Sequence, residues 1–320
     1  MFNKSLFFQK SEHNVRRFNS TLRWLLVSVL IGIVVGLISG SFGYLLQAVT
    51  AFRLSHAYLL FGLPFGAMAI VAMYHLILHE KDPGTNLVIS AIHSDDRIPL
   101  RMAPLIYIST ILTHLVGGSA GREGAALQLG GSIGNAFGEY PGFREKEDRN
   151  IMIMCGMSAA FSALFGTPIA AAVFSMEVVS VGIMHYAALV PCVVASYIAY
   201  GVACHFGLTG ERFSLGTLPE FNLPNAGKIL FLGFCCAAVS ILFCVVLHKT
   251  EEIFAEKIKN AFVRPLVSGV LIIILTMLLG TTDYLGTGMQ VVERAVVDQQ
   301  VVWCAFLLKI VFTAITLSGG

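Results

Sequence analysis

The stretch Gly117-Gly118-Ser119-Ala120-Gly121-Arg122-Glu123-Gly124 places an arginine and a glutamate inside a long apolar part of the chain. No formally charged residue lies between Met102 and Gly121, and none lies between Gly124 and Gly138. An ionisable pair in such a segment is energetically expensive and by default marks an ion or proton pathway. The four glycines let backbone N–H groups approach a small ligand. An ion pair that only ties two helices together is the alternative explanation.

The composition of the 320-residue chain is that of an integral membrane protein. Hydrophobic residues make up 56% and charged residues 12%, whereas a soluble domain carries roughly 25% charged residues. A spanning helix needs about 20 apolar residues. The charge-free runs are 24–52, 54–79, 102–121, 150–176, 178–210, 229–248 and 265–282. Several are too long or too glycine-rich for one upright helix, so we expect an all-α polytopic protein with broken, tilted helices.

The placement of positive charge predicts the orientation. Before Trp24 the chain carries five basic residues and one acidic residue, Glu12. The positive-inside rule therefore puts the N-terminal segment 1–23 in the cytoplasm. We expect a multi-pass protein of a cell membrane, the inner membrane of a bacterium, with the lipid bilayer as its surroundings and no nucleic-acid partner.

The chain repeats itself at an offset of 202 residues. Gly84-Thr85 corresponds to Gly286-Thr287, and each pair is followed 33 positions later by a second glycine, Gly117 or Gly319. Repeats in transporters are usually inverted relative to the membrane. We expect a first membrane repeat over 24–182, a connecting helix and loop over 183–225, and a second repeat over 226–320.

The second repeat is expected to be incomplete. The first copy continues past Glu123 to about residue 180, whereas the second stops at Gly320, before the equivalent of Arg122-Glu123. Backbone groups left unpaired at such a turn are costly in a membrane. We expect roughly 60 or more further residues in a complete second copy.

Broken helices can build an anion site without a full positive charge. Each helix N-terminus offers unpaired N–H groups and about half a positive charge. Asp82-Pro83-Gly84-Thr85-Asn86 breaks the chain before an apolar run, with Thr85 or Asn86 as the cap. Gly121-Arg122-Glu123-Gly124 opens a second short helix, whose later glycines allow close packing, and Gly286-Thr287-Gly288 repeats the first break.

Glu123 is the candidate for gating and proton coupling. Its carboxylate is itself a small anion, so it can occupy an anion site when charged and leave it when protonated. Desolvation brings protonation of such a group within reach of neutral pH. The candidate anion-binding residues are Gly84, Thr85, Asn86, Gly121, Arg122 and Gly124, and Arg122 is expected to support the loop more than to contact the anion.

These residues resemble the CLC family of anion channels and anion/proton antiporters. Gly121-Arg122-Glu123-Gly124 is similar to the family's GREGP motif, and the similarity extends over nearly the whole chain. The other similar stretches are 128–134, 155–161, 166–177, 285–288 and 316–320. The resemblance implies the CLC fold with an inverted repeat, a homodimer with one pathway in each subunit, and Glu123 as the gating glutamate.

Three departures from the family pattern narrow the function. The family's GSGIP loop is replaced around Gly84-Thr85-Asn86, the proline after GREG is Ala125, and the second acidic residue of the family's EE pair is Val178 after Glu177. This pattern looks like the fluoride-exporting branch, CLC-F, and an amide N–H₂ is a suitable donor for a small anion. Glu177 itself is expected to be a helix-end or solvent-facing residue.

The function expected is fluoride/proton antiport that exports fluoride, so the protein is not expected to be an enzyme. A chloride channel or chloride/proton antiporter is the alternative. A distant third is an intramembrane serine protease built on Ser119 and His185. The seven cysteines show no CxxC spacing and are expected to be small buried apolar residues, and no metal or cofactor is expected.

Overall fold

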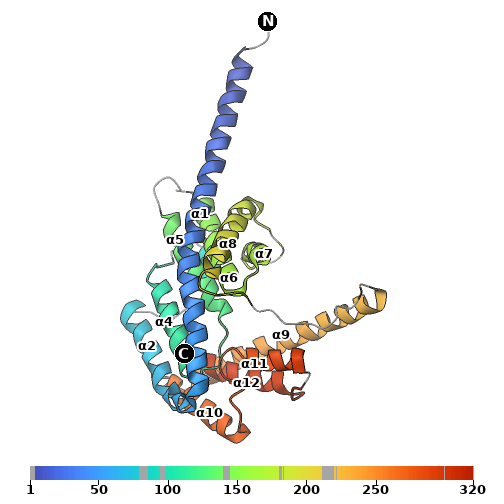
Figure 1. Ribbon diagram of the computed structural model, residues 1–320. Helices are drawn as coiled ribbons and strands as arrows, with labels where there is room; N and C mark the ends of the chain where they lie inside the picture. The colour runs from blue at the N-terminus through green and yellow to red at the C-terminus, as the bar shows by residue number, and fades with distance from the viewer. Residues whose placement is uncertain are drawn as a thin grey trace. The chain divides into compact units, whose positions relative to one another are not determined.

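The computed structural model describes residues 4–78, 86–93, 98–139, 145–179, 182, 184–210, 220, 222–298 and 300–319, with side chains from residue 20 onward except at 78, 86 and 93. All regular structure within these residues is helical, and no strand occurs among them. The predicted all-α class is therefore confirmed (Figure 1).

The chain divides into two compact units that do not follow the order of the sequence. Unit 1 comprises residues 1–45, 83–107 and 123–211, and unit 2 comprises 46–82, 108–122 and 212–320. Helices α1 (Lys4–Ser55) and α4 (Met102–Leu115) each contribute to both units. The predicted boundaries of the two repeats are a different division, and they stay a prediction.

Unit 1 is built around helix α6 (Lys146–Phe165), most of whose residues from Met152 to Leu164 are buried. Helix α6 packs against α5 (Glu123–Gly138), α7 (Pro168–Glu177) and α8 (Leu189–Cys204). Figure 1 shows α6, α7 and α8 grouped together. The short helix α3 (Asn86–His93) contacts α5 and α6, and the turn η2 (Tyr186–Ala188) leads into α8.

Glycines bring α5 and α6 to backbone contact. A Cβ atom on Gly130 would lie 2.2 Å from the carbonyl oxygen of Gly156, and one on Gly134 would lie 2.3 Å from that of Met152. On α5, Gly131 faces α3 instead, where a Cβ would meet Val88 Cγ1 at 2.5 Å. The close packing predicted from these three glycines is confirmed.

Unit 2 contains several helices and an apolar core. Its helical elements include η1 (Ala57–Gly62), α2 (Leu63–Leu78), α9 (Leu223–Lys257), α10 (Val263–Leu279), α11 (Met289–Glu293), the turn η3 (Arg294–Asp298) and α12 (Ala305–Ser318). Helix α10 packs on α2 and α12, and α12 packs on α9. The buried core cluster is Leu60, Leu63, Val116, Ile272, Tyr284, Leu285, Ala305 and Phe312.

The helices are broken where the sequence predicts breaks. The apolar run 150–176 becomes α6 and α7, because Gly166 takes a left-handed conformation (φ 69°) and Pro168 starts the next helix. Among the described residues, four helical stretches are long and apolar enough to cross a membrane: 20–55, 57–77, 186–205 and 223–257. Four shorter apolar helices, α4, α7, α10 and α12, accompany them.

Helix ends recur at nearly the expected repeat offset. Helix α4 covers Met102–Leu115 and α12 covers Ala305–Ser318, whose bounds differ by 203 residues. Helix α1 ends at Ser55 and α9 ends at Lys257, which differ by 202. A repeat with this offset would give such end positions, and the repeat itself stays a prediction.

The expectation of buried cysteines is wrong for most of them. All seven thiols are free, and Cys155 and Cys192 are buried with their sulfur atoms 3.8 Å apart. Cys204, Cys235, Cys236 and Cys244 are exposed, because their helices carry apolar side chains on outward faces as well as on packed ones. A membrane helix can expose such faces to lipid.

Candidate functional site

Glu123 is the first residue of helix α5, as predicted. The first turn of a helix leaves four N–H groups without an intrahelical partner, and its partial positive charge favours an anion there. The Glu123 residue is exposed, and no described residue forms an ion pair or hydrogen bond with its carboxylate. A structural ion pair therefore does not explain this glutamate.

The first predicted break also precedes a helix. Helix α3 begins at Asn86 and packs against α5, so two of the predicted helix starts belong to neighbouring helices of unit 1. Gly84 and Thr85 lie outside the described residues, and so does the side chain of Asn86. Gly124 lies in the first turn of α5, whereas Gly121 and Arg122 lie in unit 2.

Gly117 and Gly118 have a local role that the sequence analysis did not assign to them. Gly117 adopts φ 89°, and the Gly118 N–H donates to the carbonyl oxygen of Thr113 at 2.8 Å. A left-handed glycine with a backward hydrogen bond is a common way to end a helix, here α4. Two of the four glycines in the opening stretch are thus required by the helix end itself.

The glycine break at Gly286-Thr287-Gly288 contacts the end of α4 within unit 2. Gly286 and Gly288 both adopt positive φ, 61° and 79°, and α11 starts directly after them. The Gly286 N–H donates to the Gly118 carbonyl oxygen at 3.1 Å. Two glycine breaks that are 168 positions apart in the chain are therefore joined by a backbone hydrogen bond.

Lys309 of α12 donates hydrogen bonds to both glycine loops, the one after α4 and the one before α11. Its Nζ donates to Ser119 Oγ at 2.8 Å, to the Tyr284 carbonyl oxygen at 3.1 Å and to the Gly286 carbonyl oxygen. An ammonium group has three hydrogens to donate, and these three acceptors match them. Lys309 therefore fixes the loop that leads to Arg122 relative to the loop that leads to α11.

Ser119 is a structural residue in this network. Its side chain is 0% exposed, its N–H donates to Thr316 Oγ1 at 3.1 Å, and its Oγ lies 3.1 Å from Thr313 Oγ1. The lysine beside it donates all three hydrogens and has no lone pair with which to act as a base. The partners of Ser119 Oγ among the described residues are thus Lys309 and Thr313, and His185, the base of the predicted serine protease, is not one of them.

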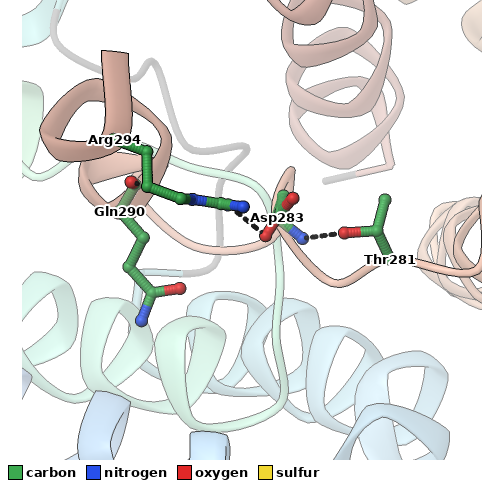
Figure 2. Close-up of polar contacts among 4 residues, drawn as sticks. All are labelled: Thr281, Asp283, Gln290 and Arg294. Atoms are coloured by element: carbon green, nitrogen blue, oxygen red, sulfur yellow. Dashed lines mark hydrogen bonds and ion pairs between the residues drawn. The ribbon is translucent and has the colours of Figure 1, made fainter. Parts of the chain in front are cut away.

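The loop before α11 is braced by a surface ion pair. Figure 2 shows Arg294 Nη2 2.5 Å from Asp283 Oδ1, with the Asp283 N–H donating to Thr281 Oγ1 at 3.2 Å. The Arg294 Nε also points at the Gln290 carbonyl oxygen, 3.4 Å away. The two charged side chains are 44% and 31% exposed, so this pair restrains the loop weakly compared with Lys309.

Two cations of unit 2 were missed by the sequence analysis. Lys309 and Arg53 are each the lone formal charge in a long apolar segment, 301–320 and 24–79 respectively. An ionisable residue in such a segment is costly and marks a functional site, and this reasoning applies to Lys309 and Arg53 as it does to Arg122 and Glu123. Glu177, by contrast, is exposed and is the last residue of α7, which confirms its predicted place at a helix end.

The fold and these breaks define a polytopic membrane protein of the broken-helix transport class. The chain belongs to the voltage gated chloride channel family, whose model matches residues 65–320. It is accordingly a CLC-type anion channel or transporter, and not an enzyme.

Similarity to individual proteins covers most of the chain. It is 33% identical over 305 residues to a "Chloride/fluoride channel protein" of Pseudomonas syringae pv. tomato, covering 93% of this chain and 67% of that protein. It is 25% identical over 258 residues to the "H(+)/Cl(-) exchange transporter ClcA" of Yersinia pestis, covering 76% of this chain and 54% of the transporter.

Solved structures agree with the family. The crystal structure of a CLC-type fluoride/proton antiporter matches with a TM-score of 0.86 and 31% identity, over 93% of this chain and 76% of the other. A slow cyanobacterial Cl-/H+ antiporter matches with a TM-score of 0.76 and 19% identity, over 93% and 74%. The second likeness shows the fold alone, whereas the first supports the resemblance to CLC proteins directly.

Proposed function

We propose that this protein is a fluoride/proton antiporter that exports fluoride. The observation that carries the proposal is Glu123, an unpaired carboxylate in the first turn of α5, in a chain 31% identical to a CLC-type fluoride/proton antiporter. A titratable group at a helix N-terminus competes with an anion for the same partial positive charge.

Glu123 is the gating and proton-coupling residue in this proposal. When ionised it occupies the anion position at the start of α5, and when protonated it leaves that position to fluoride. The backbone of Gly121 and Gly124, with Gly84, Thr85 and Asn86 before α3, supplies the anion-binding groups, and Arg122 supports the loop. An inward proton gradient then drives fluoride outward.

Two features favour fluoride over chloride. The loop around Thr85 and Asn86 lacks the serine of the family's usual chloride loop, and Val178 replaces the second glutamate after Glu177. Chloride/proton exchange is the second candidate, because the chain is also 25% identical to the Yersinia pestis ClcA exchanger. The proposed setting is a homodimer in a bacterial inner membrane, with the N-terminus in the cytoplasm.

The test is anion flux from liposomes that contain the purified full-length protein. Fluoride and chloride electrodes record efflux, and a pH electrode records proton uptake in the same vesicles. Fluoride efflux coupled to proton entry, with chloride efflux far slower, is the expected result. Equal rates for the two anions would overturn the fluoride assignment, and fluoride efflux without proton movement would make the protein a channel.

A further inference from the structure

Arg53 is a buried cation without a protein partner. It lies near the end of α1, in the part of that helix that belongs to unit 2, and it is 8% exposed. Its Nε has no hydrogen-bond partner, and no described carboxylate forms an ion pair with it. A buried charge is usually paired and hydrogen-bonded, because removing it from water is costly. Within the described residues, the Nε–H of this guanidinium therefore has no acceptor.

Two glycines keep the space beside this guanidinium free of side chains. A Cβ atom on Gly286 would lie 3.2 Å from Arg53 Nη2, and one on Gly117 would lie 3.5 Å from Arg53 Cδ. Both glycines adopt positive φ, which side-chain-bearing residues rarely take. The backbone at both breaks thus runs close beside Arg53, with no Cβ atom between that backbone and the arginine side chain.

The nearby acceptors are already used. The carbonyl oxygens of Gly286 and Tyr284 accept hydrogen bonds from Lys309, and that of Gly118 accepts one from the Gly286 N–H. None of these bonds involves Arg53. Within the described residues, no side chain or backbone oxygen is recorded as an acceptor for Arg53 Nε.

The local charge selects an anion. His114 is 2% exposed, its Nε2 has no partner, and its Nδ1 lies 2.8 Å from the Thr110 carbonyl oxygen. The charged groups that act on His114 are Arg53, Arg122 and Lys309, and all three are cations. A region with several basic groups and an unmet guanidinium attracts a small negative ion.

We propose that Arg53 is the principal donor of a second binding site for a small inorganic anion, a halide such as fluoride or chloride, in unit 2 between the glycine breaks at Gly117 and Gly286. The anion accepts hydrogen bonds from the guanidinium and completes its coordination. This site is separate from the anion position at the start of α5. It requires only that a small anion binds, not that the anion is exchanged for protons.

Occupation of the site stabilises the loop between Gly117 and Arg122. The anion neutralises the buried charge that otherwise opposes the close approach of Arg53 to this backbone. The segment that ends at Arg122, immediately before the gating glutamate, is therefore held more firmly when a halide is bound. Halide concentration would then change the stability of this loop without the halide being transported.

Bromide diffraction locates the site directly. Crystals of the full-length protein grown in sodium bromide should show an anomalous peak within about 3.5 Å of the Arg53 guanidinium, the distance of a hydrogen-bonded ion contact. A map with no peak there, or with water alone, would overturn the proposal. This measurement uses the wild-type protein, so it does not depend on whether a variant folds.

Thermal unfolding tests the same donor. The protein is melted in detergent with increasing sodium fluoride or sodium chloride, with sodium gluconate added to hold the ionic strength constant. Arg53→Met should lose part of the halide-dependent rise in Tm, or weaken the apparent halide affinity at least about tenfold, since a hydrogen bond to a charged group has been removed. Arg53→Lys should keep part of it. An unchanged halide dependence in Arg53→Met would contradict the proposal.

Arg264→Met is the matched control. Arg264 is also an arginine of unit 2, but its guanidinium already donates to the carbonyl oxygens of Ile258 and Ala255. The control should lower the stability without changing the halide dependence. The liposome assay separates the two proposals: a bromide peak at Arg53 without proton-coupled flux would contradict the transport proposal alone, and coupled flux without the peak would contradict the second site alone.

Discussion

Lys309 Nζ lies 2.8 Å from Ser119 Oγ, although the two residues are 190 positions apart in the chain. The same ammonium group donates to the backbone at Tyr284 and Gly286. One lysine in an apolar helix thus joins the loop after α4 to the loop before α11. Helix α5 starts at Glu123, four residues after Ser119 in the chain.

Lys309→Met should destabilise the protein by about 2–4 kcal/mol, because it leaves acceptors at Ser119, Tyr284 and Gly286 without their donor. Thermal unfolding in detergent measures the change. Lys257→Met, at the exposed last residue of α9, is the control and should stay close to wild type. A Lys309 variant as stable as this control would show that the three contacts contribute little.

Gly130→Ala should disrupt unit 1. The added methyl group would lie 2.2 Å from the Gly156 carbonyl oxygen, so α5 and α6 would have to separate. Overpacking of this kind costs about 1–3 kcal/mol, and often more when the obstacle is backbone. The measurement is thermal unfolding together with the yield of folded protein.

Gly201→Ala is the matched control for Gly130→Ala. Gly201 lies in α8, and no atom lies within 4 Å of the position that its Cβ would take. The substitution should raise the stability by about 0.5–1 kcal/mol, since alanine favours a helix over glycine. Equal losses from the two alanines would show that the loss at Gly130 does not come from the α5–α6 contact.

Glu123→Gln should abolish proton coupling, because glutamine cannot titrate. In liposomes, a fluoride gradient should no longer drive proton movement, and fluoride efflux should no longer be accompanied by proton uptake. Glu177→Gln, at the exposed end of α7, should retain coupling. Proton pumping that persists in Glu123→Gln would place the coupling group elsewhere.

Asp283→Asn should have only a small effect on stability. The Asp283–Arg294 pair is 31% and 44% exposed, and exposed ion pairs contribute about 0.2–1 kcal/mol. A double-mutant cycle with Arg294→Met gives the coupling energy, which should shrink as sodium chloride is raised. A coupling of several kcal/mol that is insensitive to salt would show that the loop before α11 depends on this pair.

The sequence predicted those parts of the fold that depend on local chemistry. The apolar run 150–176 contains Gly166 and Pro168, which between them end one helix and begin the next, and the structure breaks there. Glu123 starts a helix because a charged, glycine-flanked pair interrupts an apolar run. The class of the protein and the identity of the key glutamate therefore follow from residues close together in the chain.

The contacts that hold the site together could not be predicted in the same way. Two of the three acceptors of Lys309 are backbone carbonyl oxygens, which every residue possesses, so no side chain marks these two partners in the sequence. Arg53 was overlooked for a related reason: its neighbours are the glycines at 117 and 286, which offer no side chain at all. The sequence shows that Lys309 and Arg53 are each the lone charge in an apolar segment. It does not show which groups either residue contacts.

The backbone contact between Gly130 and Gly156 has a mechanical consequence. No side chains separate the backbones of the two helices at this point, so neither helix can slide along the other without a steric clash. Helix α5 is therefore fixed in position on α6. In the proposed antiport, the change at position 123 is therefore expected to be a rotation about the bonds of the glutamate side chain.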